Sequence, residues 1–551
     1  MLTPRITYER QVRFTSQGPV VVHILRGPRP GGLYALRPVL SNGFMLGRET
    51  VTSMQRRVSG TATVAGVNGD FFSWDEGLPT GMHMESGVLM APPHPLRSSL
   101  GITDDGTLVI DKVRMLGQWE GTGPRRQLGG LNQRPGPGSV RLFTPAWGGA
   151  TPAAQGTFEV TLHPFPPAAP DTELLGSVEA VKNGGGTPIP PDGAVLVGRG
   201  AAGERLVAEA PIGQTMSVRL FLRPAWEGIV DAIGAGPMLV SDGQPIFSAQ
   251  EDFSSSLTAL DPRTGVGQLA AGKIVMVAVD GRQPGYSTGV TNFELAQTLA
   301  GLGAMNAMAL DSGGSTTAAF DGHLLNHPSD PGGERAIGDG LFLFYYGVHA
   351  PPATQAVLSP NGDGVAESQR LSYKIVRPST VTASIVGPDR IPRQTQIAER
   401  APGTYRLTWS GRTPAGTPET EGRWRWVVNA LDDQQQQSSV TRVFSLNNTL
   451  GYLRVRPSRL VVHKRAAANL QVGFRLAHSA VVTVRIETAR GVRVRVIRQR
   501  RRAGQATIRW NGRYANGTRA FSGPYIARVQ TSNAFGRAEL KRRFSVRRAR
   551  R

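Results

Sequence analysis

Two aspartates, Asp280 and Asp311, are placed where a chain can present catalytic groups. Asp280 follows the apolar run 273–279 and Asp311 follows the apolar run 305–310, so each carboxylate stands just beyond a predicted β-strand. Paired carboxylates supply the acid, the base or the nucleophile when a bond to a sugar is broken. Asp311 and Asp280 are therefore candidate catalytic residues.

The segment between the two strands predicts how these aspartates are positioned. Thr291 and Glu294 form a capping box, apolar residues follow at helical spacing, and Gly303 stands where a helix ends. A strand, a helix and a second strand of this length indicate a right-handed crossover between parallel strands. Both carboxylates are then expected at one edge of a sheet. The main chains would be about 5 Å apart in adjacent strands, or about twice that with one strand between them. The alternative is that each aspartate only forms a turn or caps a helix.

The turn after Asp311, SGGSTT, has the composition of a binding loop. Gly313 and Gly314 allow the backbone to approach a ligand, Ser315 and Thr316 offer hydroxyl groups, and successive N–H groups can bind an anion. The GxxxxGK[ST] phosphate loop is missing, and no GxGxxG follows a strand with an acidic partner. We therefore expect no nucleotide or dinucleotide cofactor.

Six further polar residues flank predicted strands and are candidates for substrate binding. An arginine fork suits bidentate binding of a phosphate. Each also has an ordinary structural explanation, because asparagines form turns and buried charges form ion pairs. Neither an H-x-H nor an HExxH pattern occurs, so no catalytic metal is expected, and the absence of cysteine excludes thiolate chemistry. The six are Asn68, Asp70, Arg263, Thr264, Asn326 and Arg335.

The order of these motifs resembles the phosphodiester glycosidase family over about residues 20–348. The resemblance rests on seven segments, and the family's Asp-Gly-Gly-Gly-Ser appears here as Asp311-Ser312-Gly313-Gly314-Ser315, with one glycine replaced by serine. That replacement is expected to cost backbone freedom. The segments are GVNGDFF, GLPTG, AIGAGPMLVSDGQ, DPRTGVG, VMVAVDGR, ALDSGGSTTAAFDG and NHPSDPGGERAIGDGLFLF.

The resemblance implies a hydrolase that cleaves the glycosidic bond of a sugar-1-phosphodiester, such as an N-acetylglucosamine-1-phosphodiester, in surface glycans or exopolysaccharides. Asp311 is the first choice for the catalytic carboxylate, with Asp280 or Glu334 second, and Arg263 or Arg335 would hold the phosphate. A retaining and an inverting route both remain open. The alternative is a non-catalytic cell-surface protein that binds a glycan or a polyanion.

Composition predicts three domains. Residues 1–350 are expected to form an α+β or mixed α/β catalytic domain with a central sheet, made of N-terminal strands 1–59 and a core at 60–348. The stretch 117–200 would be an inserted lobe or long connections.

Residues 354–446 and 451–551 look like two copies of an all-β unit, each with a strand that ends in tryptophan before two glycine turns. They resemble the immunoglobulin-like domain of flagellar hook-capping proteins. The SPNGDG segment at 359–364 of the first repeat favours an Asx-type turn over a calcium site.

Positive charge is concentrated in the last repeat. Residues 451–551 hold 26 Lys and Arg against two acidic residues, whereas the whole chain has a formal charge of +22. Either contact with phosphate and carboxylate groups or an arginine-rich genome explains this bias. We expect an anionic wall polymer as a partner of this module, and no specific nucleic acid.

No apolar run approaches the roughly 18 residues of a membrane span, and the N-terminus lacks a leader pattern. The resemblance nevertheless implies an extracellular or cell-surface location.

Overall fold

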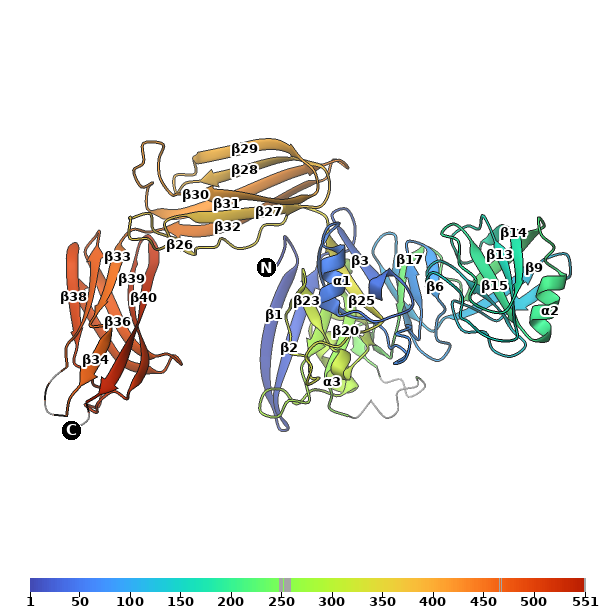
Figure 1. Cartoon of the computed structure of the whole chain (residues 1–551), viewed down its shortest axis with the longest axis horizontal. Helices are drawn as coiled ribbons and strands as arrows, with labels where there is room; N and C mark the ends of the chain where they lie inside the picture. Colours follow the sequence, from blue (N-terminus) through green and yellow to red (C-terminus); the bar gives the residue numbers. More distant parts are fainter. Residues whose placement is uncertain (247–250, 252–258, 465, 467, 550–551) are drawn as a thin grey trace. The chain divides into compact units, whose positions relative to one another are not determined.

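The computed structural model describes residues 1–246, 251, 259–464, 466 and 468–549. The chain divides into two compact units, Met1–Tyr346 and Gly347–Arg551. It is mostly β-structure, with 52% strand and 7% helix, and the elements are labelled in Figure 1. The expectation of an α+β or mixed α/β domain with a central sheet is therefore wrong. Within the described residues the α-helices are short and few: α1 (Val51–Val58), α2 (Ala201–Ala208) and α3 (Asn292–Gly301).

The predicted crossover forms, but in a sheet that is otherwise antiparallel. Strands β21 (Ile274–Val279) and β22 (Ala304–Leu310) are joined through α3, and β20 (Arg263–Leu269) lies between them and is antiparallel to both. Two strands that are each antiparallel to β20 are parallel to one another, as the crossover requires. The remaining neighbouring pairs of this sheet are also antiparallel, and two of them, β1/β2 and β18/β19, are joined by short turns.

This seven-stranded sheet is covered on both faces, which explains why its central strands are apolar throughout. Leu295 and Leu299 of α3 pack with Val277 on one face. On the other, Met276 and Met308 pack with residues of a second sheet. In spatial order the other strands are β1 (Thr7–Thr15) and β2 (Gly18–Gly27) beside β21, and β18 (Met238–Ser241) and β19 (Gln244–Pro245) beyond β22.

The second sheet brings another set of strand ends to the same region. Its five strands, in spatial order, are β24 (His323–Leu324), β23 (Ala318–Phe320), β4 (Thr63–Asn68), β25 (Asp339–Tyr345) and β3 (Tyr34–Leu40). Asn68 at the end of β4 is paired with Gly340 at the start of β25.

Two further sheets complete the first unit. A five-stranded sheet runs in the order β6 (Val88–Ala91), β5 (His83–Glu85), β17 (Ile229–Gly234), β7 (Ser99–Thr103) and β8 (Leu108–Asp111). The chain between β8 and β17 forms a lobe with its own eight-stranded sheet and α2, so the stretch 117–200 belongs to a folded insertion rather than to long connections. The lobe strands are β10 (Arg126–Leu128), β9 (Arg114–Glu120), β16 (Thr215–Arg223), β14 (Glu173–Asn183), β13 (Thr157–Leu162), β15 (Ala194–Arg199), β12 (Val140–Phe143) and β11 (Gly130–Leu131).

The second unit contains two pairs of sheets built on the same plan. In the first pair, β26 (Val357–Leu358), β32 (Gln437–Leu446), β31 (Gly422–Asp432), β28 (Ser379–Val386) and β29 (Pro392–Arg400) form one sheet, and β27 (Gln369–Ile375) and β30 (Gly403–Trp409) form the other. In the second pair, β34 (Arg459–Val462), β40 (Gly536–Arg548), β39 (Gly523–Asn533), β36 (Ala480–Thr488) and β37 (Arg493–Arg501) lie opposite β33 (Leu450–Arg456), β35 (Leu470–Leu476) and β38 (Gly504–Trp510). The strand-terminal Trp409 and Trp510 are buried in the two cores. Arg550 and Arg551 of the basic stretch lie outside the described residues.

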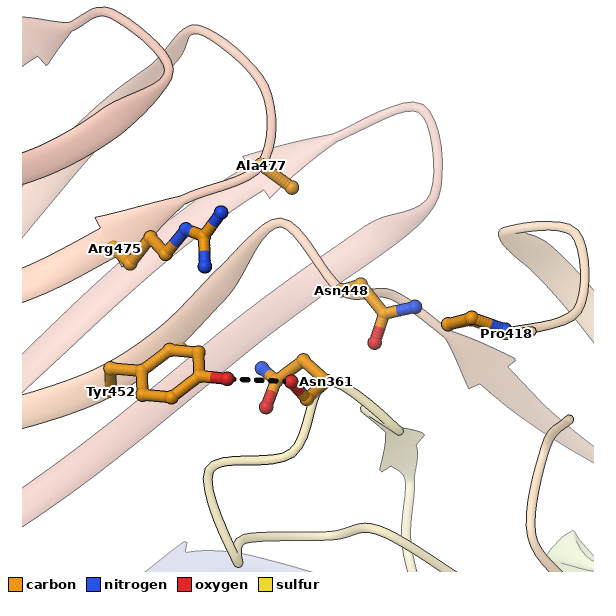
Figure 2. Close-up of a pocket in the computed structure, with 7 residues that line it drawn as sticks. Asn361, Pro418, Asn448, Tyr452, Arg475 and Ala477 are labelled. Atoms are coloured by element: carbon orange, nitrogen blue, oxygen red, sulfur yellow. Dashed lines mark hydrogen bonds between the residues drawn. The ribbon is translucent and has the colours of Figure 1, made fainter. Parts of the chain in front are cut away.

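The SPNGDG segment joins the two modules of this unit (Figure 2). The Asn361 side chain accepts a hydrogen bond from the Asp363 N–H at 2.9 Å, which is the expected Asx turn. Asp363 in turn accepts from the Tyr452 N–H at 2.7 Å, and the Tyr452 hydroxyl donates to the Asn361 carbonyl oxygen at 2.8 Å. A cavity of about 220 Å³ lies beside these contacts and is lined in part by Asn448 and Arg475. The segment thus acts as a brace between the modules.

In the described part of the chain, no helix has the length and apolar character needed to cross a membrane.

Candidate active site

The main chain of Asp311 is held from two sides by the end of β4. The Asp311 N–H donates to the Gly69 carbonyl oxygen at 2.9 Å, and Asn68 Nδ2 donates to the Asp311 carbonyl oxygen at 2.8 Å. Asn68 Oδ1 accepts from the Thr264 hydroxyl at 2.8 Å and from the Thr317 N–H at 3.0 Å. Asn68 and Thr264 are fully buried, so both predicted binding residues position the Asp311 loop and do not face solvent.

Asp311 is a half-buried residue, and the pKa of its carboxyl is raised. Burial raises the pKa of Asp311 to about 6, against the opposing effect of hydrogen bonds from Ser315 and the Ser312 N–H and of the Arg335 charge. The Ser312 N–H donates to Asp311 Oδ1 at 2.7 Å. A carboxyl with this pKa changes its protonation state near neutral pH, as catalytic carboxyls do.

The two aspartates lie at the same edge of the sheet, on either side of β20. Thr264 of β20 is paired with Ala278 of β21 and with Leu310 of β22. Asp280 and Asp311 follow those strands directly, so one strand separates them. Their main chains are therefore about 10 Å apart by strand spacing, the larger of the two expected separations.

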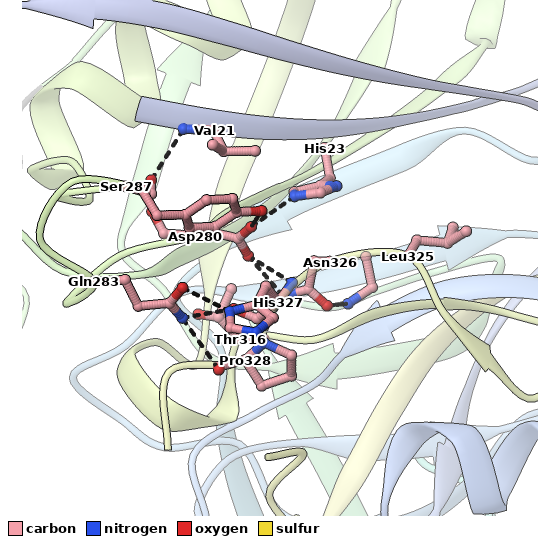
Figure 3. Close-up of polar contacts among 12 residues, drawn as sticks. Val21, His23, Asp280, Gln283, Ser287, Thr316, Leu325, Asn326, His327 and Pro328 are labelled. Carbon is pink, nitrogen blue, oxygen red and sulfur yellow. Dashed lines mark hydrogen bonds and ion pairs between the residues drawn. The ribbon is translucent and has the colours of Figure 1, made fainter. Parts of the chain in front are cut away.

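Asp280 is buried and is bonded through both carboxylate oxygens (Figure 3). Its Oδ2 lies 2.8 Å from His23 Nε2 and accepts from the Tyr286 hydroxyl at 3.0 Å. Its Oδ1 accepts from Asn326 Nδ2 at 3.1 Å and from the His327 N–H at 3.0 Å. Asp280 is 1% exposed, so neither oxygen faces a space where a substrate could bind.

Asn326 connects this network to the turn after Asp311. Its Nδ2 also donates to the Thr316 carbonyl oxygen at 3.0 Å, and its Oδ1 accepts from the Ala318 N–H at 2.8 Å. The Thr316 hydroxyl is buried and has no hydrogen-bond partner. Asp280 and Asn326 therefore fix the far side of the turn, just as Asn68 fixes the near side.

The two glycines of this turn are required for different reasons. Gly313 has φ +65°, in the left-handed region that favours glycine. A Cβ at Gly314 would lie 2.0 Å from Arg335 Nη2 and 2.1 Å from Asp330 Oδ1, so glycine is required there for close approach. Ser312 has φ −125°, an extended conformation open to any residue. The expected backbone cost of serine at this position is therefore not incurred.

The two candidate arginines occupy different settings. Arg335 lies over the turn, where it forms a two-pronged ion pair with Asp330 at 2.8 and 2.9 Å and places Nη1 3.4 Å from the Ser315 hydroxyl. Arg263 is 2% exposed. It donates to the carbonyl oxygens of Val290 and Ala259 at 3.2 and 2.9 Å, beneath the turn. Arg263 Nη1 also donates to the Ser312 hydroxyl at 3.4 Å, but Arg335 is the more exposed of the two, with 20% of its side chain accessible, and is the better placed to meet a ligand.

Glu334 faces away from this group. Its carboxylate accepts from the Thr52 N–H at 2.8 Å and from the Thr52 hydroxyl at 2.7 Å. Thr52 lies in the first turn of α1, where unpaired N–H groups favour a negative charge. The neighbouring side chains of Glu334 and Arg335 thus contact different elements, the first turn of α1 and the turn after Asp311.

A second buried network lies behind Asp311 and contains Asp70. The Asp70 N–H donates to Asp339 Oδ1 at 2.8 Å, and Asp339 Oδ2 lies 2.9 Å from His83 Nδ1. His83 Nε2 lies 2.8 Å from Glu85 Oε1. Burial and the Asp339 charge raise the pKa of Asp70. Burial disfavours a charged His83, but hydrogen bonds with Asp339 and Glu85 outweigh it and raise its pKa to about 9. This network fixes the β4–β25 junction.

Sequence reasoning missed several members of these networks, notably His23, His83 and Asp339. His23 stands inside an otherwise apolar strand, PVVVHIL, where a polar side chain needs a buried partner. That position is the signal that could have found it. Among the described residues, no group of three or more His, Asp or Glu side chains is arranged to hold a metal.

Comparison with known proteins gives this arrangement a family context. Residues 173–344 match the phosphodiester glycosidase family. Residues 460–534 match the FlgD Ig-like domain. Both resemblances predicted from the motifs are confirmed, in the predicted order.

Two curated relatives share parts of the chain. The "SPbeta prophage-derived uncharacterized protein YomE" of Bacillus subtilis is 35% identical over 22% of this chain and 18% of its own length. The N-acetylglucosamine-1-phosphodiester alpha-N-acetylglucosaminidase of Bos taurus is 29% identical over 25% of each. The chain thus spans a quarter or less of the length of these relatives. A hypothetical protein from Synechocystis has a similar fold, with a TM-score of 0.53 and 24% identity over 62% of each chain.

Proposed function

We propose that the first unit hydrolyses a sugar-1-phosphodiester at the glycosidic C–O bond, and releases a sugar and a phosphomonoester. The observation that carries this proposal is Asp311. This residue is half-buried, its carboxyl has a pKa of about 6, and it lies near Arg335 within a segment that matches the phosphodiester glycosidase family.

Asp311 is the catalytic carboxylate in this proposal. It either attacks the anomeric carbon or removes a proton from the attacking water, and it stabilises the positive charge that develops on the sugar ring. The phosphomonoester leaves as a weak base, so protonation of the leaving oxygen contributes less than in an ordinary glycoside. Stabilisation of charge contributes correspondingly more.

Arg335 and the N–H groups of Gly314 and Ser315 bind the phosphate, whereas the Gly313 N–H donates to the Pro262 carbonyl oxygen at 2.9 Å. The Asp330 ion pair fixes the guanidinium plane, and donors that need no reorganisation stabilise the leaving group best. Asp280, Asn326, Asn68 and Arg263 are positioning residues that hold the turn by the contacts described above. Glu334 has no catalytic part, because its carboxylate is committed to α1.

The test is product analysis in ¹⁸O-labelled water with an N-acetylglucosamine-1-phosphodiester. The expected result is label in the released sugar, with turnover lost in Asp311→Asn and kept in the matched carboxyl variant Glu334→Gln. Label in the phosphate would mean P–O cleavage and would overturn the proposed reaction. The anomeric configuration of the first-formed sugar, read by NMR, distinguishes retention from inversion.

A second candidate function is polyanion binding by the second unit. Strand β37 lies at the edge of its sheet and carries Arg493, Arg495, Arg498, Arg500 and Arg501 within nine residues. Such a row favours an anionic surface polymer as partner and, together with the proposed substrate, an extracellular or cell-surface place of action. This activity would act beside the hydrolase rather than replace it.

A further inference from the structure

The outer face of the five-stranded sheet in the last repeat, residues 451–551, contains a hollow of about 440 Å³. Strands β36, β37, β39 and β40 contribute to it, and its lining includes Arg485, Arg498, Arg537, Thr483 and Ser532. Residues that alternate with these along the strands form the core on the opposite face. The hollow therefore combines three guanidinium groups with two hydroxyls on a surface that faces solvent.

The arginines of β37 are divided between the two faces of this sheet. Arg498 is paired with Thr483, and both line the hollow. Arg495 and Arg501 are paired with buried core residues of β36. Residues that are paired directly across two strands point to the same side of a sheet. Only part of the β37 charge therefore borders the hollow, and Arg485 and Arg537 add to it from other strands.

The first repeat, residues 354–446, has an uncharged hollow at the equivalent place. This second hollow has a volume of about 560 Å³ and lies over β28, β31 and β32. One row of paired residues crosses these strands: Thr382, Asn429 and Ser439. The equivalent row of the last repeat crosses β36, β39 and β40: Thr483, Gln530 and Glu539. The two rows relate the positions of one repeat to those of the other.

This relation shows where the charge of the last repeat comes from. The positions of Arg485, Arg498 and Arg537 are occupied in the first repeat by Ser384, Ile397 and Gln437, in that order. The hollow is thus a feature of the shared plan of the modules, whereas its positive charge is present in the last repeat and absent from the first.

Most of this charge is available to a ligand. Among the described residues, Arg485 and Arg498 form neither an ion pair nor a hydrogen bond through their side chains. Arg537 lies 3.0 Å from Glu539, but Glu539 is also paired with Arg528. An anion in the hollow therefore meets two unpaired guanidinium groups and a third whose partner is shared.

We propose that this hollow binds a phosphate group of a phosphodiester-linked polyol polymer through Arg485, Arg498 and Arg537. The inference rests on the second candidate function and specifies its site and the chemical group that it recognises. Guanidinium groups bind phosphate oxygens through paired N–H donors. The hollow is larger than one phosphate group, so the adjoining polyol can contact the hydroxyls of Thr483 and Ser532. Surrounding charges attract the polymer, and the hollow fixes where its phosphate binds.

The first test removes the same charge from the two faces of the sheet. Arg485→Gln/Arg537→Gln should weaken binding of the full chain to poly(glycerol phosphate) by about tenfold or more, because both arginines line the hollow. Arg495→Gln/Arg501→Gln removes equal charge from the opposite face and should weaken binding by less than about threefold. Equal losses would mean that overall charge binds the polymer, so the second candidate function would stand and the hollow would fall. Equal affinity for polyglutamate would overturn recognition of phosphate.

The second test transfers the site to the first repeat. Ser384→Arg/Ile397→Arg/Gln437→Arg places arginines around the uncharged hollow, and calorimetric titration with a glycerol phosphate trimer counts the sites. Ile397 is 71% exposed, so an arginine there leaves the core intact. The wild type should bind one trimer per chain and the variant two. An unchanged stoichiometry would overturn the site. If the trimer is bound in this way but the long polymer is not, the site stands and the polymer-binding function falls.

Discussion

At the scale of single residues, the proposal depends on the ionisation of Asp311. Its pKa is raised to about 6 by burial, and the proposed roles require the carboxylate form. We therefore expect kcat/KM to fall about tenfold per pH unit as pH drops below about 6. The pH profile of the wild type against an N-acetylglucosamine-1-phosphodiester checks this.

The matched control is Glu334→Gln, which removes a carboxylate that caps α1. It should lower the free energy of unfolding by about 1 kcal/mol. The fall of kcat/KM below about pH 6, the acidic limb of the pH profile, should stay unchanged. A limb that rises instead toward low pH would mean that Asp311 acts as a general acid, contrary to the role assigned to it.

Of two substitutions in the turn after Asp311, one is expected to lower activity and the other to leave most of it. Gly314→Ala places a Cβ against Arg335 and Asp330, so it should displace the guanidinium and lower kcat/KM by at least about tenfold. Ser312→Gly should keep most of the activity, because Ser312 is already extended. It should cost about 0.5–1 kcal/mol of stability through the more flexible unfolded chain. Kinetics and denaturant unfolding of the two variants test the pair. If both variants lost the same activity, the cause would be a general disturbance of the turn and not displacement of the Arg335 guanidinium.

At the scale of elements, the sequence predicted the pieces of the site better than their arrangement. The capping box of α3 forms as expected, with Thr291 and Glu294 bonded reciprocally, since capping is a local property of a few residues. The position of β20 between β21 and β22 was not predictable, because it depends on pairing between distant strands. The same reason explains the wrong fold class: strand direction is set by long-range pairing, which alternation and apolar runs do not encode.

The β5 strand illustrates a residue whose role only the fold reveals, and it supports a stability prediction. His83 of β5 lies between Asp339 and Glu85 with a pKa raised to about 9, against about 6.5 in an unfolded chain. A raised histidine pKa stabilises the fold fully below about 6.5, and this contribution is lost as pH rises through 9. The free energy of unfolding should therefore decline across this range by an amount on the order of 3 kcal/mol.

Denaturant unfolding at several pH values measures this decline. In His83→Gln, stability should be lower at pH 6, and the drop between pH 6.5 and 9 should become smaller. Asp70 contributes a decline of the same sign, because its pKa is also raised, so some slope remains in the variant. An unchanged slope would show that His83 is not the titrating group.

At the scale of the whole molecule, the candidate active site and the excess of positive charge lie in different parts of the chain. The first 450 residues carry almost no net charge, whereas the last repeat carries 26 cations against two acids. Arg528 in that repeat is already paired with Glu487, at 3.2 Å, and with Glu539. The edge strand β37 is different, because Arg498 and Arg500 are exposed there. Arginines on an edge strand also prevent edge-to-edge pairing, so a binding role has to be distinguished from that protective one.

The distinguishing measurement is the salt dependence of binding to poly(glycerol phosphate). The full chain should bind with a log-log salt slope that reflects the phosphates neutralised, and Arg498→Gln/Arg500→Gln should reduce the slope by about 1–2. The control Arg370→Gln/Arg406→Gln removes two exposed arginines from strands β27 and β30 of the other module and should leave it unchanged. If Arg498→Gln/Arg500→Gln aggregates and its salt slope is unaltered, the arginines of β37 serve to prevent edge-to-edge pairing and not to bind the polymer. Equal binding to DNA, with the same slope, would mean that the row recognises polymer charge alone, because no base-reading element accompanies it.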